Sequence, residues 1–269
     1  MSSNQGVYVY ALHKCASIFL YKLFEEIARE KGWKYWPNGT GDASGPGRDQ
    51  WEVEQDVESS FCFCPIRHFH ARRADFEHVP KERIHHFFHL RDPRDILVSA
   101  YFSFGWMHVQ PQGMSDEEWT NYQDHIQNQT ADEYALANQA TLWDRIAPLL
   151  DVVDSLPNIH VVRYETMVLN YREWLGEFQE AFGLSQDELD DYHQRHKAEF
   201  ENIAELTPEK IQQGDCKGPD FHKRKVYPGD YLDKLQPETI VALNKTFAPL
   251  ARFGYDLGDP SALRPAKAG

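Results

Sequence analysis

A lysine and a serine occupy the turn between the first predicted strand and the first predicted helix. The turn spans residues 13–17 (HKCAS) and follows a β-rich run over residues 7–12. Apolar residues then recur at helical spacing over residues 20–28. A strand that leads through a short turn into a helix points the free N–H groups of the helix at one place, which suits an anion and above all a phosphate. Lys14 and Ser17 would add a charge and a hydroxyl donor. The alternative is an ordinary strand-turn-helix unit with an exposed lysine.

An arginine and a serine form the second candidate pair. Arg91 follows a predicted strand over residues 84–90, so it lies at a strand's carboxyl end, where α/β proteins place ligand groups. Ser99 lies two turns into the next predicted helix and could turn its hydroxyl toward the same anion. The planar fork of arginine matches phosphate oxygens. The alternative is a surface arginine paired with Asp95.

A dense cationic cluster forms the third candidate. Residues 222–225 (HKRK) lie in a predicted loop over residues 207–231, and Gly229 and Asp230 form a turn shortly after them. The cluster opposes the charge balance of the whole chain, whose formal net charge is −14. A run of charges is usually a solvated surface, but this contrast favours an anionic ligand.

These three stretches, in this order, resemble the motifs of the sulfotransferases that use 3′-phosphoadenosine 5′-phosphosulfate (PAPS). The first is similar to the family's loop P-K-[ST]-G-[ST]-[ST]-W, here residues 13–19. The second matches R-[ND]-P-[RK]-D-x-x-x-S at every specified position, over residues 91–99. The third is similar to R-K-G-x-x-G-D-W, here residues 224–231, and residues 164–165 match a Y-E that the family carries before a helix. The likeness spans residues 7 to about 255.

The resemblance implies transfer of a sulfuryl group from PAPS to a hydroxyl or amine of a small-molecule acceptor, with adenosine 3′,5′-bisphosphate as product and no metal. In an in-line transfer the protein positions the groups and stabilises charge on the leaving phosphate, which would be the role of Lys14. Ser17 and the N–H groups of the loop would hold the 5′ end. The 3′-phosphate would be held by Arg91, Ser99, Arg224 and Lys225. The residues that the resemblance assigns to donor binding are Lys14, Cys15, Ala16, Ser17, Ile18, Phe19, Arg91, Ser99, Tyr164, Arg224 and Lys225.

Three positions depart from the family's pattern. His13 replaces a proline before the lysine, so the entry to the loop is less rigid. Ile18 replaces a hydroxyl that could donate to the 5′-phosphate. Val226 replaces a glycine whose backbone could approach the 3′-phosphate closely, and a β-branched residue resists positive φ. These departures bear on affinity for the donor.

A general base must take the acceptor's proton, and histidine is the usual choice near neutral pH. In cytosolic members of the resembled family the base follows a strand between the two phosphate motifs. His68 is the matching candidate and His70 is the second. A carboxylate, Glu54 or Glu58, is the alternative.

Two other interpretations use the cysteines. Cys62, Cys64, His68 and His70 have the side-chain types of metal ligands, but Cys-x-Cys alternation on a strand favours buried cysteines over a structural zinc site. Cys15 in the anion loop could be a thiolate of low pKa. Two other function classes also remain: a P-loop-related small-molecule kinase, which would be expected to carry the G-x-x-x-x-G-K-[ST] motif that is absent here, and a non-catalytic binder of PAPS or the bisphosphate.

The elements that must position these residues alternate between strand and helix along the chain. Further strands are predicted over residues 32–36, 59–65 and 158–164. Helices are predicted from Pro93 to about residue 104 and over residues 116–128, 131–153, 165–182, 186–203 and 237–253. This alternation predicts an α/β fold with a central, mainly parallel sheet flanked by helices, and the resemblance implies a P-loop-NTPase-like sulfotransferase fold. We expect a single domain over residues 1–269, with a core over about 6–256 and a tail over 257–269.

A Gly-rich segment over residues 37–48 is predicted to be a loop or a lid that orders on ligand binding. Trp33, Trp36 and Trp51 bracket it. We expect one of these tryptophans either to cover the adenine of the donor or to fill the core beside the second strand.

Composition and charge limit the location and the partners. Four cysteines are too few for a disulfide scaffold of 269 residues, and with no signal peptide or membrane span in the sequence they predict a cytoplasmic protein. The acidic balance disfavours nucleic acid and anionic membranes as partners. Acidic side chains would favour a cationic acceptor if they lined its pocket, and on a solvated surface they serve solubility instead. The sequence does not specify the acceptor or an oligomeric state.

Overall fold

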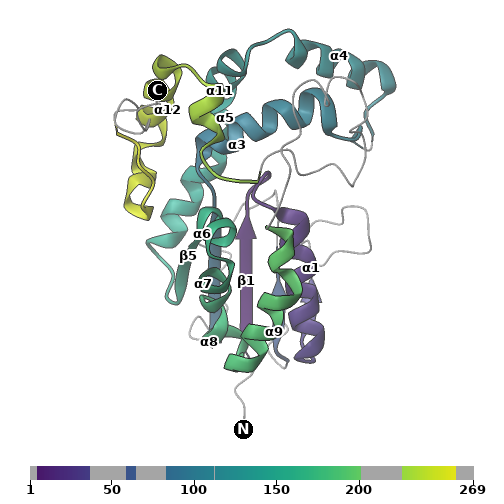
Figure 1. Cartoon of the computed structure of the whole chain (residues 1–269), viewed down its shortest axis with the longest axis vertical. Helices are drawn as coiled ribbons and strands as arrows, with labels where there is room; N and C mark the ends of the chain where they lie inside the picture. The colour runs from purple at the N-terminus through teal and green to yellow at the C-terminus, as the bar shows by residue number, and fades with distance from the viewer. Residues whose placement is uncertain (1–4, 37–58, 65–82, 112, 201–225, 259–269) are drawn as a thin grey trace, which may run out of the picture. The chain divides into compact units, whose positions relative to one another are not determined.

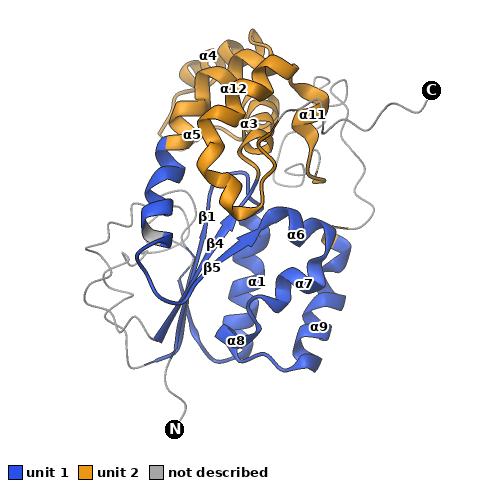
Figure 2. Cartoon of the chain, turned by 90° about the vertical axis from the view of Figure 1, so that its left-hand side faces the viewer, with its two compact units in different colours: residues 1–91, 144–198 blue, residues 92–143, 199–269 orange. Residues whose placement is uncertain are grey.

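The computed structural model describes residues 5–36, 59–64, 83–111, 113–200 and 226–258 (Figure 1). The chain divides into two compact units (Figure 2). Unit 1 comprises residues 1–91 and 144–198, and unit 2 comprises residues 92–143 and 199–269. Among the described residues, no helix combines the length and the apolar character needed to cross a membrane.

Unit 1 is built on a parallel sheet with the strand order β2-β3-β1-β4-β5. Its strands are β1 (Gly6–Ala11), β2 (Lys34–Trp36), β3 (Phe61–Phe63), β4 (Ile84–Leu90) and β5 (Ile159–Arg163). β1 lies in the middle and pairs with β3 on one side and β4 on the other. All four strand pairs are parallel. This confirms the predicted fold class, and it brings the carboxyl ends of the strands to one edge, where α/β proteins bind ligands.

Aromatic side chains fill one face of this sheet. Tyr8 of β1 lies 5.8 Å from Phe61 and 5.3 Å from His86, measured between ring centroids. Tyr10 stacks on Phe88 at 4.8 Å. The register explains Gly6, which pairs with Phe61, because a Cβ at this position would lie 2.5 Å from that ring. These contacts fix the register of β1 and therefore the place where its carboxyl end leaves the sheet.

Helices cover the other face. Figure 2 shows α1 (Ser17–Glu30) on the same side of the strands as α6 (Tyr164–Leu169), α7 (Tyr171–Gly176), α8 (Gln179–Phe182) and α9 (Gln186–His196). Phe24 of α1 lies 5.0 Å from Phe178, and Phe178 lies 4.4 Å from Phe87 of β4. The buried stripe of α1 is Leu20, Leu23, Phe24, Ile27 and Ala28, as its helical spacing predicts.

The predicted continuous helix over residues 165–182 is wrong, because this stretch forms the three short helices α6, α7 and α8. Asn170 causes the first break. Its backbone is not helical (φ −147°, ψ 70°), and its side chain accepts a hydrogen bond from the N–H of Glu173 at the start of α7. The predicted helix over residues 186–203 is also too long, since α9 ends at His196 and a 3₁₀ turn, η4 (Lys197–Glu199), follows.

Unit 2 is helical in its described part. Its elements are α3 (Pro93–Phe102), the π-helical turn η3 (Ser103–Met107), α4 (Asp116–Gln127), α5 (Ala131–Val153) as far as residue 143, α11 (Asp230–Lys234), α12 (Pro237–Phe247) and the 3₁₀ helix η6 (Ala248–Phe253). Ala100, Tyr101, Ile126 and Tyr134 form a buried cluster that joins α3, α4 and α5. The predicted helices over residues 116–128 and 131–153 are confirmed. The predicted helix over residues 237–253 is α-helical only as far as Phe247, and the predicted loop over residues 207–231 includes the first two residues of α11, Asp230 and Tyr231.

Candidate functional site

The turn after β1 has an unusual backbone. Lys14 (φ 70°) and Ala16 (φ 60°) both adopt the left-handed conformation, and the N–H of Cys15 donates to the carbonyl of Leu12 at 3.3 Å. Left-handed residues other than glycine cost on the order of 1–3 kcal/mol each and persist where the surroundings enforce them, often at ligand sites. Consecutive turns of this kind point backbone N–H groups into a concavity that binds anions.

The N-terminus of α1 opens into this turn. Ala16 is the N-cap residue, and within the described residues no side chain caps the helix there. The first N–H groups of a helix have no intrahelical partner, and they carry the positive end of the helix dipole. Ser17 begins the helix with a half-buried side chain, and Ile18 is 45% exposed. The geometry therefore suits an anion, as predicted, although the position that would carry a second hydroxyl presents an exposed aliphatic side chain.

Phe19 is the aromatic residue of this turn. Its ring lies 5.8 Å from Tyr171, 6.0 Å from His196 and 6.5 Å from Trp174. These contacts to α7 and α9 hold a half-buried ring in the first turn of α1.

Arg91 joins the carboxyl ends of β1 and β4. Its Nη1 donates to the carbonyl of Lys14 at 2.7 Å, and its guanidinium carbon lies 4.2 Å above the ring of Tyr164. The Arg91 residue is 5% exposed, so this cation–π contact forms away from bulk water, where it is worth more. The structure thus brings together three residues that the sequence assigned to the site from segments 77 and 73 residues apart (91 − 14 and 164 − 91).

Sequence reasoning missed His89, which lies two residues before Arg91 on β4. His89 is fully buried, and its ring lies 5.6 Å from Trp174 and 6.3 Å from Tyr164. Burial lowers the pKa of His89 to about 3, against an opposing effect of the neighbouring Cys15 backbone. The imidazole is therefore neutral at physiological pH. It lies on the same strand as two other histidines, His85 and His86, so the sequence did not single it out.

The thiolate interpretation of Cys15 is wrong. Cys15 is fully buried, and burial raises the pKa of its thiol to about 12, so the group is a neutral thiol at physiological pH. Cys62 and Cys64 are fully buried as well, and burial raises the pKa of both thiols. They pack as small apolar side chains. Within the described ranges, no group of three or more His, Cys, Asp or Glu side chains is placed to hold a metal ion.

Unit 2 begins at Asp92, the second residue of the RDPRD segment (residues 91–95). Asp92 caps α3 by accepting a hydrogen bond from the N–H of Arg94 at 2.9 Å, and the Arg94 guanidinium makes a forked pair with the same carboxylate at 2.9 and 2.6 Å. The carboxylate of Asp95 accepts hydrogen bonds from the N–H groups of Gly229 and Tyr231. Ser99 lies within α3 with a half-buried side chain.

Several predicted site residues lie outside the described part of the chain. They are Glu54, Glu58, His68, His70, Arg224 and Lys225, together with Trp51 and the predicted lid over residues 37–48. Trp33 lies 5.2 Å from Phe182, and Trp36 lies 6.0 Å from Phe61. These contacts favour the core-filling interpretation for both tryptophans.

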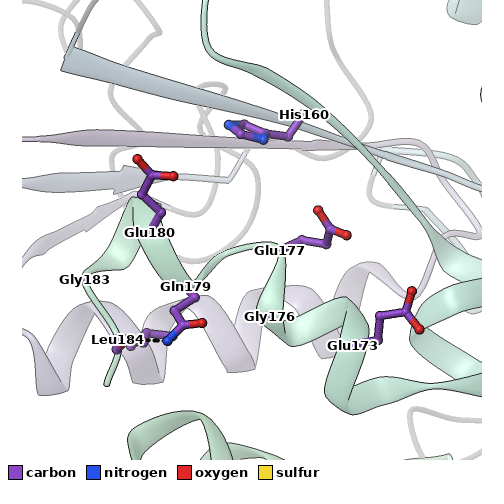
Figure 3. Close-up of a pocket in the computed structure, with 8 residues that line it drawn as sticks. All are labelled: His160, Glu173, Gly176, Glu177, Gln179, Glu180, Gly183 and Leu184. Carbon is purple, nitrogen blue, oxygen red and sulfur yellow. Dashed lines mark hydrogen bonds between the residues drawn. The ribbon is translucent and has the colours of Figure 1, made fainter. Parts of the chain in front are cut away.

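A surface groove of about 600 Å³ lies elsewhere in unit 1, lined by residues of β5, α7 and α8 and of the turns that follow these helices (Figure 3). Figure 3 shows the carboxylates of Glu177 and Glu180 directed toward the side of the groove where His160 lies. Burial lowers the pKa of His160, and the two carboxylates oppose that shift. His160 lies near the amino end of β5, and among the described residues the groove's lining contains none from the three motifs.

Comparison with known proteins gives a family and a fold. The family model described as "Sulfotransferase domain" matches residues 81–253. The chain is structurally similar to mouse sulfotransferase SULT7A1 complexed with PAP, with a TM-score of 0.54 and 13% sequence identity over 92% of this chain and 85% of that one. A second similar structure is retinol dehydratase in a complex with retinol and PAP, with a TM-score of 0.48 and 13% identity over 91% of this chain and 80% of that one. No curated protein matches the chain in sequence.

The family match covers 173 residues (253 − 81 + 1) out of 269, including the arginine-serine motif, Tyr164 and the late basic loop. The chain therefore belongs to the family of proteins that share the sulfotransferase domain.

Proposed function

We propose that the protein transfers the sulfuryl group of PAPS to a hydroxyl or amine of a small-molecule acceptor and releases adenosine 3′,5′-bisphosphate. The observation that carries this proposal is the contact between Arg91 and the Lys14 carbonyl. This contact joins the first residue of the motif over residues 91–99 to a left-handed turn that is suited to a phosphate. The similar mouse sulfotransferase is described in complex with PAP, which agrees with a donor that carries two phosphates.

The residues of the turn fit such a donor. The N-terminus of α1 supplies N–H groups and a positive dipole end, and Ser17 can add a hydroxyl. The Lys14 ammonium would stabilise the charge that develops on the leaving 5′-phosphate, which is where a preorganised charge accelerates group transfer most. Cys15 and Ala16 would contribute backbone N–H groups to the phosphate site. Burial keeps the thiol of Cys15 neutral. Ile18 and Phe19 would flank the nucleotide from the first turn of α1.

The 3′-phosphate is assigned to Arg91, Ser99, Arg224 and Lys225. The Arg91 guanidinium, whose Nη1 donates to the Lys14 carbonyl, carries five N–H groups in a planar fork that matches phosphate oxygens. The Tyr164 ring under this guanidinium holds it in one orientation and would lie beside the nucleotide.

For the chemical step we propose a histidine base, with His68 first and His70 second; Glu54 and Glu58 are the carboxylate alternatives. His89 is unsuited to the role, because its fully buried ring cannot reach an acceptor and its pKa is lowered to about 3. A cytoplasmic setting and a single domain over residues 1–269 remain part of the proposal. The three described cysteines support a reducing compartment, since all are free thiols.

Calorimetric titration with nucleotides tests the donor site. Adenosine 3′,5′-bisphosphate is expected to bind at least tenfold tighter than AMP, a difference of about 1.4 kcal/mol, because a separate group of cations meets the 3′-phosphate. Arg91→Ala is expected to lose most of this preference. Lys245→Ala, on an exposed position of α12, is the control and is expected to keep it.

ATP distinguishes the alternatives. A kinase would bind ATP better than the bisphosphate, and equal affinity for AMP and the bisphosphate in the unmodified protein would overturn the 3′-site assignment. A binder without activity would show the nucleotide preference but no turnover with any acceptor.

A further inference from the structure

His89 is a buried imidazole near the carboxyl end of β4, where it pairs with Ala11, the last residue of β1. Its ring lies 5.6 Å from the ring of Trp174 of α7. Side chains two positions apart on a strand point to the same face of the sheet, and Phe87, two residues earlier, packs on the helical face. His89 therefore points to the face that carries α1.

The polar atoms of this ring lack a good partner. Both ring nitrogens of His89 are buried, and within the described residues neither makes a hydrogen bond of good geometry. Burial lowers the pKa of His89 to about 3, and the Cys15 backbone opposes this shift. A backbone group that raises the pKa of an imidazole is an acceptor, because the protonated ring carries two N–H donors. The carbonyl of Cys15 therefore faces the ring.

The direction of this carbonyl sets the direction of a donor in the turn. The carbonyl of Cys15 and the N–H of Ala16 belong to one planar trans peptide group, in which the two point in opposite directions. A Cys15 carbonyl held at the buried ring thus directs the Ala16 N–H away from the interior. Ala16 is the left-handed N-cap residue of α1, and an anion in such a turn is bound by N–H groups that point toward it.

Arg91 holds the preceding carbonyl of the turn. Its Nη1 donates to the carbonyl of Lys14 at 2.7 Å. Arg91 and His89 are two residues apart, and both lie against Tyr164, the guanidinium carbon at 4.2 Å and the imidazole at 6.3 Å from the ring centroid. Two side chains from the end of β4 therefore meet two successive carbonyls of the turn.

From this arrangement we propose that His89 is a positioning residue for the donor's 5′-phosphate. In the phosphate-bound turn, a ring N–H of His89 donates to the Cys15 carbonyl and so keeps the Ala16 N–H directed at the phosphate. The bond also removes the cost of leaving a buried polar group without a partner. This role of His89 rests on the proposed function.

Calorimetry with two nucleotides tests this role in the full-length protein. Adenosine 3′,5′-bisphosphate and adenosine 3′-monophosphate differ only in the 5′-phosphate. His89→Leu removes the N–H donor. This variant is expected to lose about tenfold in affinity for the bisphosphate and to keep its affinity for the monophosphate, because one donor to the 5′-phosphate is no longer held in place. His89→Gln keeps a side-chain N–H donor and is expected to retain most of the affinity.

His86→Phe is the matched control. His86 is also a buried histidine of β4, but its Nδ1 shares a hydrogen bond with the Tyr10 hydroxyl on the opposite face of the sheet. This variant is expected to change neither affinity. If circular dichroism shows that His89→Leu does not fold, His89→Phe, which has a ring without an N–H, takes its place with the same expected selective loss.

Three results would contradict a positioning role of His89. The first is an equal loss of affinity for both nucleotides, which would make the role of His89 purely structural. The second is full affinity for the bisphosphate in a folded variant without the N–H. The third is a His89→Gln variant as weak as His89→Leu. If the unmodified protein does not bind the bisphosphate more tightly than the monophosphate, the proposed 5′-phosphate site fails before His89 is tested.

Discussion

At the scale of single residues, the side chains of residues 91–95 make two different sets of contacts. Arg91 faces the Lys14 turn, whereas Arg94 and Asp95 hold the backbone and ring of the late loop. The motif pattern identifies all of these residues but not this division, because the partners of Arg94 and Asp95 lie more than a hundred residues further along the chain. His89 was missed for the same reason: its burial depends on helices that follow β5.

Lys14 is the residue whose loss should affect chemistry most. Lys14→Ala is expected to lower kcat by roughly 10²-fold or more and to change affinity for the bisphosphate much less, because its additional interaction develops with charge on the leaving phosphate. Steady-state kinetics and calorimetry measure the two effects. Lys22→Ala, an exposed lysine of the same helix, is the control. Near-normal turnover of Lys14→Ala would show that the turn does not hold the reacting phosphate.

At the scale of elements, hydrophobic spacing predicted which segments are helices and strands better than where they end. The β4 strand and α5 have the bounds that the sequence predicts. The stretch over residues 165–182 does not have the predicted bounds. Apolar residues continue at helical spacing past Asn170, whereas the backbone of Asn170 is not helical. The side chain of an asparagine can hydrogen-bond to a backbone N–H and so compete with the backbone hydrogen bonds of a continuous helix. The spacing of apolar residues does not reveal this competition.

Arg94 connects several elements of unit 2 through its hydrogen bonds. It joins the start of α3 to Asn244 of α12 and to the carbonyl of Asp256, with almost no exposure. Arg94→Ala is expected to lower the free energy of unfolding by roughly 3–5 kcal/mol, because it leaves a buried carboxylate without its partner.

A matched exposed pair provides the comparison for Arg94. Arg172 pairs with Asp190 at 2.8 Å, but both side chains are accessible to water. Arg172→Ala is therefore expected to cost less than about 1 kcal/mol. Urea unfolding followed by circular dichroism measures both variants. Equal losses would contradict the role assigned to the buried network.

At the scale of the whole molecule, the family match includes parts of both units. The matched residues, 81–253, include the three boundaries between the units, which fall at residues 91–92, 143–144 and 198–199. The motif over residues 91–99 itself begins in unit 1 and continues in unit 2. The single domain predicted from the sequence stays a prediction.

Buried histidines make the stability of the molecule depend on pH. His86 is 1% exposed, and burial lowers its pKa to about 3. As pH falls below about 6.5, the unfolded chain binds a proton that the folded chain does not, so stability decreases down to the folded pKa. Each such histidine contributes up to about 1.4 kcal/mol per pH unit.

Urea unfolding at pH 7 and pH 5 tests this dependence. His86→Phe is expected to flatten the slope of stability against pH, whatever its effect on stability at pH 7. A variant whose slope equals that of the unmodified protein would show that His86 is protonated in the folded state.

The central claim is that the protein moves a sulfuryl group from PAPS to a small acceptor. The most direct measurement incubates the protein with PAPS and a panel of alcohols, phenols and amines, cationic ones included, and follows both products by mass spectrometry. We predict that at least one acceptor gains the mass of one SO₃ group while adenosine 3′,5′-bisphosphate appears in equal amount, and that Lys14→Ala abolishes most of both signals. Release of the bisphosphate without a sulfated acceptor, or no consumption of PAPS by a protein that binds the bisphosphate, would contradict the account.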